Sequence, residues 1–167
     1  MEPVTISPAT AADAGALDAA LRRLSAGPGD THRAGPDMQA AALSGPDPAS
    51  HALLVRPVPA AAGATGRAVG AALFARLFST TRGMAGGHVA DLWVAPERRG
   101  TGLGPHLLAA VRDCAAWRWG AGFPRLGGYA SNTRARAFHD RPGFWPNAGE
   151  TSLTLTGPAV AALKGAP

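Results

Sequence analysis

The pattern of apolar and polar positions in the first third of the chain predicts a strand followed by two helices. Residues 4–7 form a short β-prone run that ends at a proline. Leucines then recur at helical spacing, which predicts one apolar stripe on a helix over residues 11–25. Thr10 and Asp13 stand where a helix N-cap and its partner three residues later are expected. Glycine–proline pairs enclose a second, shorter helix near residues 37–44.

Long apolar runs dominate the middle of the chain. Residues 51–58 and 67–78 predict two strands, and a turn at 60–66 between them favours a hairpin. The second run is also long enough for a helix, but Gly70 disfavours that alternative. We expect the polar, glycine-containing residues 79–87 to form a loop before the next strand.

A strand, a tight turn and a helix are predicted in the centre of the chain. The apolar residues 88–94 predict the strand, and an amphipathic helix starts at about residue 102. Pro105 is compatible with this helix, because the first helical turn needs no N–H at that position. Cys114 falls on the apolar side of the helix, which favours a core position over a nucleophile.

The last part of the chain completes a mixed pattern of strands and helices. Residues 125–130 predict a strand, and residues 133–141 predict a helix with Asn132 as its N-cap. Residues 150–156 alternate between polar and apolar side chains, which predicts a final strand. The order of all these elements predicts an α/β (α+β) fold, with a mixed sheet flanked by helices in a single domain of residues 1–167.

Composition places the chain among folded proteins. Hydrophobic residues make up 46% of the sequence and charged residues 16%, which argues against disorder. No apolar run reaches the roughly 18 residues that a membrane span needs. The N-terminus lacks the features of a signal peptide, and a single cysteine excludes an internal disulfide. We therefore expect a cytoplasmic protein with no membrane partner.

The chain is basic, with a formal net charge of +5 at pH 7. A basic surface is typical of nucleic-acid-binding proteins. The arginines are scattered, however, and the aromatic residues form no platform on which bases would stack. We expect no nucleic-acid partner, and we attribute the charge of the C-terminal half to a polyanionic ligand.

The turn between the central strand and its helix has the composition of an anion site. Gly100, Gly102 and Gly104 alternate directly after Arg99. Glycines allow a ligand to approach the backbone closely, and the first turn of a helix presents unpaired N–H groups to anions. The spacing fits neither the P-loop nor the dinucleotide fingerprint. These residues predict a phosphate or pyrophosphate ligand.

Two segments of the second half of the chain resemble one protein family. Arg99, Gly102 and Gly104 fit the pattern Arg-x-x-Gly-x-Gly. Residues 131–144 resemble a second pattern, Asn-x-x-Ala-x-x-Phe-Tyr-x-x-x-Gly-Phe. Together the two patterns are similar to those of the GNAT acetyltransferase superfamily, and the resemblance extends over residues 67–157. Within that superfamily the chain looks most like the diamine (spermidine/spermine) N-acetyltransferase branch.

The resemblance implies a mostly antiparallel central sheet and acetyl-CoA as the co-substrate. It implies that the coenzyme contacts the end of the central strand, the glycine turn and the second motif. The residues concerned are Leu92, Trp93, Val94, Arg99, Gly100, Thr101, Gly102, Leu103, Gly104, Pro105, Asn132 and Phe138. No metal is expected, because no cluster of His, Cys, Asp and Glu residues has the spacing of metal ligands.

Two positions that bear on catalysis depart from the family pattern. His139 stands where the family commonly has a tyrosine that returns a proton to the departing thiolate. A histidine titrates near neutral pH and can do the same, or else the acid is lost and His139 is a surface residue. Ala90 replaces a glutamate that the diamine branch usually has. Asp91 remains beside it, either as a base or as a structural carboxylate.

The acceptor is the least defined part of the prediction. By resemblance, Asp30, His32 and Asp37 flank the acceptor cleft, although each can equally be a solvated loop residue. The expected reaction is acetyl transfer to a primary amine of a small molecule, such as a polyamine or amino acid, by direct attack in a ternary complex. Alternatives are a protein N-terminus or lysine as acceptor, or a coenzyme A-binding domain with a regulatory role. Family habit suggests a homodimer formed through the C-terminal strand.

Overall fold

The structure is a computed structural model that describes residues 2–58, 67–147 and 149–163. The turn predicted at 60–66 lies outside these residues. The chain divides into two compact units, Met1–Gly127 and Gly128–Pro167. The first unit holds a five-stranded sheet, and the second holds two short helices.

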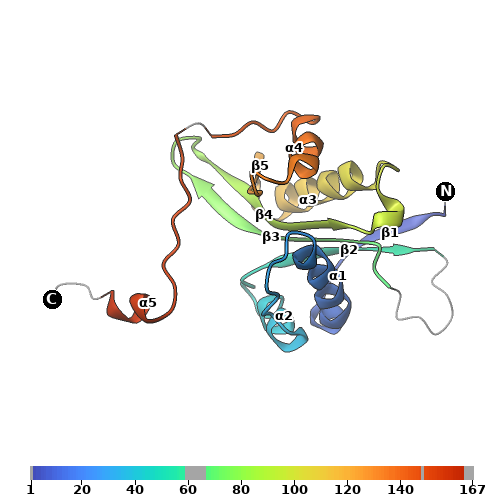
Figure 1. The fold of residues 1–167 in the computed structure, drawn as a ribbon, viewed down its shortest axis with the longest axis horizontal. Coiled ribbons are helices and arrows are strands. Elements are labelled where there is room, and N and C mark those ends of the chain that lie inside the picture. Colours follow the sequence, from blue (N-terminus) through green and yellow to red (C-terminus); the bar gives the residue numbers. More distant parts are fainter. Residues whose placement is uncertain (1, 59–66, 148, 164–167) are drawn as a thin grey trace. The chain divides into compact units, whose positions relative to one another are not determined.

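The sheet of the first unit has the strand order β1-β2-β3-β4-β5 (Figure 1). The strands are β1 (Val4–Pro8), β2 (His51–Pro57), β3 (Gly70–Ser79), β4 (Met84–Val94) and β5 (Phe123–Leu126). The first four strands pair antiparallel in succession, whereas β5 joins β4 in parallel. This arrangement confirms the mixed, mostly antiparallel sheet and the hairpin-like pairing of β2 with β3.

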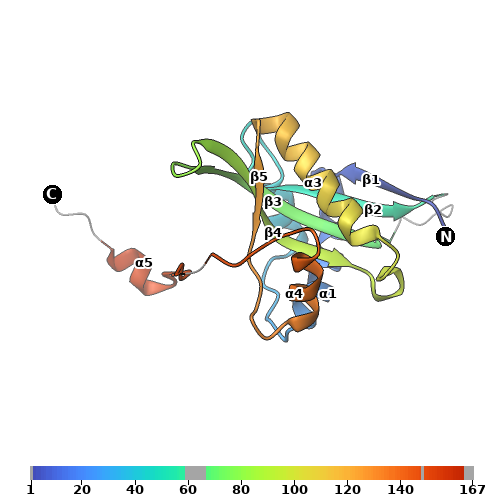
Figure 2. The same cartoon turned by 90° about the horizontal axis from the view of Figure 1, so that it is seen from above.

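Helices cover both faces of the sheet. α1 (Ala14–Ala26) and α2 (Pro36–Ala42) lie on one face, and α3 (Leu103–Trp119) lies on the other (Figure 1). Figure 2 shows α3 lying along the sheet, with β5 beside β4. Before α1, the Asp13 carboxylate accepts hydrogen bonds from the backbone N–H and the hydroxyl of Thr10, at 2.8 and 3.0 Å. The predicted pairing of these two residues is therefore confirmed.

Apolar side chains from the sheet and from both helical layers form the core. The largest fully buried side chains are Phe74, Leu17, Leu54, Leu107, Val55 and Val111. Burial of each such side chain stabilises the fold by about 1.5–3 kcal/mol. The apolar stripes that predict α1 and α3 are thus the buried faces of these helices, and they hold the sheet from opposite sides.

The loop predicted at 79–87 is wrong, because β4 already starts at Met84. The turn after β3 occupies only residues 80–83. Gly86 and Gly87 are buried strand residues, and a Cβ on Gly86 would lie 2.6 Å from Phe123 Cζ. These glycines serve close packing inside the sheet rather than a turn.

The strand predicted at 125–130 is largely wrong as well. β5 starts earlier, at Phe123, and ends at Leu126, and Tyr129 lies outside any strand or helix. The parallel ladder joins β5 to β4 only from Gly86 to Val89. The early end of β5 leaves the C-terminal half of β4 without a partner strand on that side, among the residues that the structure describes.

The second unit contains α4 (Thr133–Asp140) and α5 (Pro158–Ala162). Asn132 Oδ1 accepts a hydrogen bond from the Ala135 N–H at 3.0 Å, which confirms Asn132 as the N-cap of α4. The final strand predicted at 150–156 is wrong, because these residues form no regular element. Alternating side chains produce a strand only where a neighbouring strand supplies hydrogen bonds.

Candidate active site

The C-terminal half of β4 has one open edge. β5 pairs with β4 only from Gly86 to Val89, whereas β3 pairs with β4 along its whole length. A bulge at Ala90 interrupts the β3 ladder, since Val89 and Asp91 on either side of it face consecutive residues of β3. Within the described structure, the pairing of β4 with β5 therefore ends at Val89, directly before the bulge, and the edge from Asp91 to Val94 is open.

The backbone groups of Leu92 and Val94 point to this open edge. The Val94 carbonyl accepts a hydrogen bond from Arg99 Nε at 3.0 Å, whereas the Ala95 N–H is bonded on the β3 side, at 2.9 Å. The backbone N–H and C=O groups of successive residues point to opposite edges of a strand. Those of Leu92 therefore point to the same open edge as those of Val94, whereas those of Trp93 point to β3. An extended polar chain laid along this edge would meet Leu92 and Val94.

A turn with two left-handed glycines connects β4 to α3. Gly100 and Gly102 have φ angles of 79° and 85°, in the region that favours glycine. A Cβ at either position would meet no atom within 4 Å, so conformation rather than space requires glycine. Gly102 is the N-cap of α3, and the N–H groups of the first helical turn have no acceptor within the helix. Because Pro105 has no N–H, Leu103 and Gly104 supply those donors.

The two arginines before this turn have different surroundings. The Arg98 side chain is 13% exposed and pairs with the carboxylate and the carbonyl of Glu2, which ties the N-terminal segment to the loop. Arg99 is exposed and uses its Nε to bind the Val94 carbonyl. The Thr101 hydroxyl donates to the Arg98 carbonyl at 2.8 Å and closes the turn. Of the two cations, Arg99 is the one that an anion at the turn can reach.

Trp93 faces α1 and belongs to the core. Its side chain is only 2% exposed, and the Arg23 guanidinium of α1 lies 5.8 Å from the ring centroid. Asp91 precedes Trp93 by two residues, so both side chains project from the same face of β4. The contact of Trp93 with a coenzyme stays a prediction.

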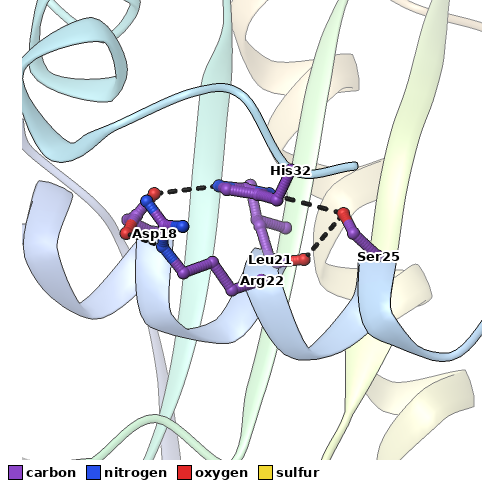
Figure 3. A network of polar contacts seen from close by, with 5 residues as sticks. All are labelled: Asp18, Leu21, Arg22, Ser25 and His32. Atoms are coloured by element: carbon purple, nitrogen blue, oxygen red, sulfur yellow. Dashed lines mark hydrogen bonds and ion pairs between the residues drawn. The ribbon is translucent and has the colours of Figure 1, made fainter. Parts of the chain in front are cut away.

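On the face of the sheet that α1 covers, His32 is held in a polar network (Figure 3). Asp18 of α1 is buried, and its Oδ2 accepts a hydrogen bond from Arg22 Nε at 2.8 Å. Its Oδ1 lies 2.9 Å from His32 Nε2. The Ser25 hydroxyl lies 3.4 Å from His32 Nδ1 and donates to the Leu21 carbonyl at 3.1 Å. The network fixes the His32 ring, which comes from the loop after α1.

Sequence reasoning misses Asp18, although a signal for it exists. Asp18 follows Leu17 directly and is three residues before Leu21, so it lies at the margin of the apolar stripe of α1. An acid in that position is buried only if it finds partners. Ser25, His32 and Asp18 also form a chain of the Ser–His–Asp type. The Ser25 hydroxyl lies 3.1 Å from the Leu21 carbonyl and 3.4 Å from His32 Nδ1, so its shorter contact is with the backbone and not with the base that an activated nucleophile requires.

Asp91 is a partly buried carboxyl beside the bulge. Burial raises its pKa, the charges of His32 and His88 oppose that effect, and the net pKa is above the ordinary value. A carboxyl with a raised pKa is a better proton acceptor at neutral pH than an exposed one. Asp91 therefore has the environment that a general base requires.

The three residues predicted to line the acceptor cleft differ in the structure. Asp30 lies in the loop after α1 and Asp37 in the first turn of α2, and both are exposed. His32 is mostly buried, and it is the one of the three whose charge acts on the Asp91 carboxyl. Of the three, His32 is thus the residue whose charge lowers the pKa of Asp91, against the effect of burial.

Asn132, Phe138 and His139 belong to the second unit. The His139 ring centroid is 4.9 Å from that of Phe138 and 5.8 Å from that of Phe144. Burial lowers the pKa of His139, and Asp140 opposes the effect, so the neutral imidazole is favoured at pH 7. His139 Nδ1 has no hydrogen-bond partner within the described part of the chain. The roles of Asn132, Phe138 and His139 toward a coenzyme stay predictions.

None of the described helices is long and apolar enough to cross a membrane. In the described part of the chain, no group of three or more His, Cys, Asp and Glu side chains is placed to hold a metal ion. Cys114 is partly buried in α3.

Several solved structures share this fold at low sequence identity. A ribosomal-protein-alanine N-acetyltransferase from Brucella melitensis biovar Abortus 2308 is 20% identical, with a TM-score of 0.70 over 92% of this chain and 100% of its own. An integron cassette protein from the mobile metagenome of V. cholerae is 16% identical, with a TM-score of 0.73 over 96% of each chain. The aminoglycoside N-acetyltransferase AAC(6')-Iy in complex with CoA is 15% identical, with a TM-score of 0.69 over 94% of this chain and 96% of its own. Among curated protein sequences, none gives a match.

The sequence itself identifies the family. Residues 28–144 match the acetyltransferase (GNAT) family, and this range includes the open edge of β4, the glycine turn and α3. The match spans more than half of the chain. The chain therefore belongs to the GNAT acetyltransferase family, whose members are acetyl-CoA-dependent N-acetyltransferases.

Proposed function

We propose that this protein transfers an acetyl group from acetyl-CoA to a primary amine of a small molecule, by direct attack within a ternary complex. The observation that carries the proposal is the open edge of β4 at Leu92 and Val94, which leads directly into the turn at Gly100 and Gly102. An extended polar arm can pair with such an edge as an added strand. A diphosphate can bind the N–H groups at the start of the following helix.

In this proposal the pantetheine arm and the diphosphate of the coenzyme each have a counterpart in the chain. The pantetheine amides pair with the backbone of Leu92 and Val94. The diphosphate binds the N–H groups between Gly100 and Gly104, and Arg99 adds an exposed positive charge. The remaining contacts rest on family resemblance alone and come from Trp93, Thr101, Leu103, Pro105, Asn132 and Phe138.

The chemistry needs a proton acceptor for the amine and a proton donor for the sulfur. Asp91 takes a proton from the acceptor's ammonium, and the neutral nitrogen attacks the thioester carbonyl carbon. Backbone N–H groups at the open edge stabilise the charge that develops on the carbonyl oxygen. The carbon–sulfur bond then breaks, the nitrogen loses its second proton to water to give the amide, and the sulfur receives a proton from His139 or from water. Because the pKa of His139 is lowered, its protonated fraction at neutral pH is small.

The acceptor is proposed from likeness rather than from a described pocket. The resemblance to the diamine branch and the likeness to two aminoglycoside acetyltransferases both favour a small amine. A protein N-terminus is the second candidate, because the Brucella structure is named as a ribosomal-protein-alanine N-acetyltransferase. A regulatory coenzyme-binding domain is a third, motivated by Ala90 in place of the glutamate. We also propose that the protein is a homodimer.

The experiment proceeds in two steps. Calorimetry with acetyl-CoA and with CoA tests the coenzyme site, and heat is expected from both. Incubation with acetyl-CoA and a panel of polyamines, amino acids, aminoglycosides and peptides is then followed by release of free thiol. Release with a small amine supports the proposal, and release with peptides alone favours the protein acceptor. Coenzyme binding without any thiol release favours the regulatory role, and the absence of binding overturns all three.

A further inference from the structure

Asp91 and Trp93 are neighbours on one face of β4. They pair with Leu73 and Ala71 of β3 in an unbroken register, which places both side chains on the same side of the sheet. Neighbours on one face of a strand have Cα atoms about 6.6 Å apart. Because Trp93 packs against Arg23 of α1, this is the face that α1 covers. Asp91 is half-buried on it.

Arg23 holds a positive charge over the ring of Trp93. It is an exposed residue in the last turn of α1, and its guanidinium carbon lies 5.8 Å from the ring centroid. This cation–π contact fixes the position of the charge. Among the described residues, no carboxylate or carbonyl accepts a hydrogen bond from Arg23. Its N–H donors are therefore available to a ligand on the face that Asp91 shares.

The neighbouring arginine of α1 is already engaged. Arg22 Nε donates to Asp18 Oδ2 at 2.8 Å, and Asp18 Oδ1 lies 2.9 Å from His32 Nε2 (Figure 3). Both oxygens of the Asp18 carboxylate thus have partners within the protein. Of the carboxylates and arginines that α1 and β4 contribute, Asp91 and Arg23 remain for a ligand.

Opposite charges at two points of one face match a ligand that carries both an ammonium group and an anion. Asp91 attracts the ammonium, as the proposed transfer requires, and a guanidinium binds a carboxylate through paired N–H donors. A diamine matches less well, because Arg23 repels its second ammonium and Asp18 is occupied. The charges on this face therefore point away from the polyamines that resemblance to the diamine branch suggests.

We propose that the acceptor is an amine that also carries a carboxylate, with its ammonium group at Asp91 and its carboxylate at Arg23. This inference rests on the proposed function and names the class of its acceptor. Asp91 takes a proton from the ammonium, and the neutral nitrogen attacks the thioester. The carboxylate keeps its charge throughout, so Arg23 binds substrate and transition state equally and determines specificity rather than the rate of the chemical step.

Matched amines with and without a carboxylate test the inference on the wild-type protein. γ-Aminobutyrate and propylamine differ only by the carboxylate, which lies far enough from the amine to leave its basicity nearly the same. With saturating acetyl-CoA, kcat/KM from thiol release should be about 10- to 100-fold higher for γ-aminobutyrate, the range for hydrogen bonds to charged groups. β-Alanine and ethylamine form a second pair. Equal values, or higher values for the amines without a carboxylate, overturn the inference.

Variants of Arg23 test whether it is the source of the preference. Arg23→Gln should raise the KM for γ-aminobutyrate about 10- to 100-fold, with little change in kcat and none in kcat/KM for propylamine. Arg23→Lys keeps the charge without the planar donors and should retain part of the preference. Arg112→Gln, an exposed position of α3 on the opposite face, is the control. An equal loss for both amines in folded Arg23→Gln protein would assign Arg23 a structural role and overturn the inference.

A binding measurement needs no turnover and separates the inference from the proposed function. Calorimetry with γ-aminobutyrate in the presence of CoA should show binding to the wild-type protein and weaker binding to Arg23→Gln. Equal binding by the two proteins overturns the inference alone. Failure of the wild-type protein to bind acetyl-CoA counts instead against the proposed function.

Discussion

The glycine turn before α3 and the polar network beneath α1 flank the same strand but are built differently. The turn consists of backbone groups, and Gly100 and Gly102 shape it through their positive φ angles. The network joins the side chains of Asp18, Arg22 and Ser25 of α1 to His32 of the following loop. Local sequence therefore specifies the turn, whereas the network forms only when the loop after α1 folds back onto the helix.

This difference determines which substitutions each region tolerates. A backbone site depends on the conformation of a few residues, so a side chain matters there when it changes φ or adds charge. A side-chain network depends on burial and on matched partners, so loss of one charge alters the others. Substitutions that change conformation, charge or burial one at a time therefore separate the two regions.

Gly102→Val should have the largest effect, the loss of measurable acetyl-CoA binding. At a φ of 85° a β-branched residue costs about 1–3 kcal/mol, so the turn changes shape and its N–H groups lose their alignment. Gly45→Val is the matched control, because Gly45 has a φ of 94° and equally open surroundings but lies beyond α2. Calorimetry on both folded variants measures the difference. Equal binding by the two variants would contradict a coenzyme site at the turn.

Asp91→Asn should lower kcat by about 100-fold, the usual range for loss of a general base, and leave the Kd for acetyl-CoA unchanged. The amide has nearly the shape of the carboxyl but does not accept the proton. Asp113→Asn, at an exposed position of α3, controls for the loss of one negative charge. Full activity of Asp91→Asn would assign the carboxylate a structural role.

Arg99→Gln and Arg98→Gln form a pair that sharpens the account of the turn. Loss of the exposed Arg99 charge should raise the Kd for acetyl-CoA by about tenfold, because charge-assisted hydrogen bonds to phosphate are lost. Arg98 is already engaged by Glu2, so its replacement should leave coenzyme binding unchanged and lower the free energy of unfolding by about 1 kcal/mol or less. Titration calorimetry and urea denaturation measure the two quantities. Equal Kd values for the two variants would remove the distinction between the arginines.

Sequence patterns predict the elements whose cause is local. The leucine stripe of α1, the cap at Asn132 and the strand–turn–helix order around Gly102 all depend on residues close together in the chain. The pairing of β2 with β3 and the mixed sheet follow from the element order and the family resemblance. These features were predictable because each has a short-range signal.

The features that sequence reasoning misses depend on distant partners. The sequence around Gly86 predicts a loop, and only the close approach of Phe123 shows that Gly86 packs inside the sheet. The alternating pattern of residues 150–156 predicts a strand, but these residues form no regular element. Likewise Asp18 and His32 are separated by a helix end and a loop, so their contact appears only when the chain folds back. All three features depend on tertiary packing, which a local sequence pattern does not predict.

The smallest expected effect concerns the pH dependence of folding, and it tests whether the network is ionic. Burial raises the pKa of Asp18, but hydrogen bonds from Arg22 and His32 outweigh it, so the folded pKa lies below the ordinary value of 3.8. A carboxyl with a lowered folded pKa contributes stability above its unfolded pKa, and the contribution is lost as the pH falls through the folded pKa. Asp18→Asn should therefore lower the free energy of unfolding by about 1 kcal/mol at pH 7, and the difference from wild type should shrink below about pH 4. Urea denaturation at pH 7, 5 and 3 measures it, with Asp113→Asn as the charge control. A deficit that stays constant down to pH 3 would show that Asp18 stabilises the fold by its shape and not by its charge.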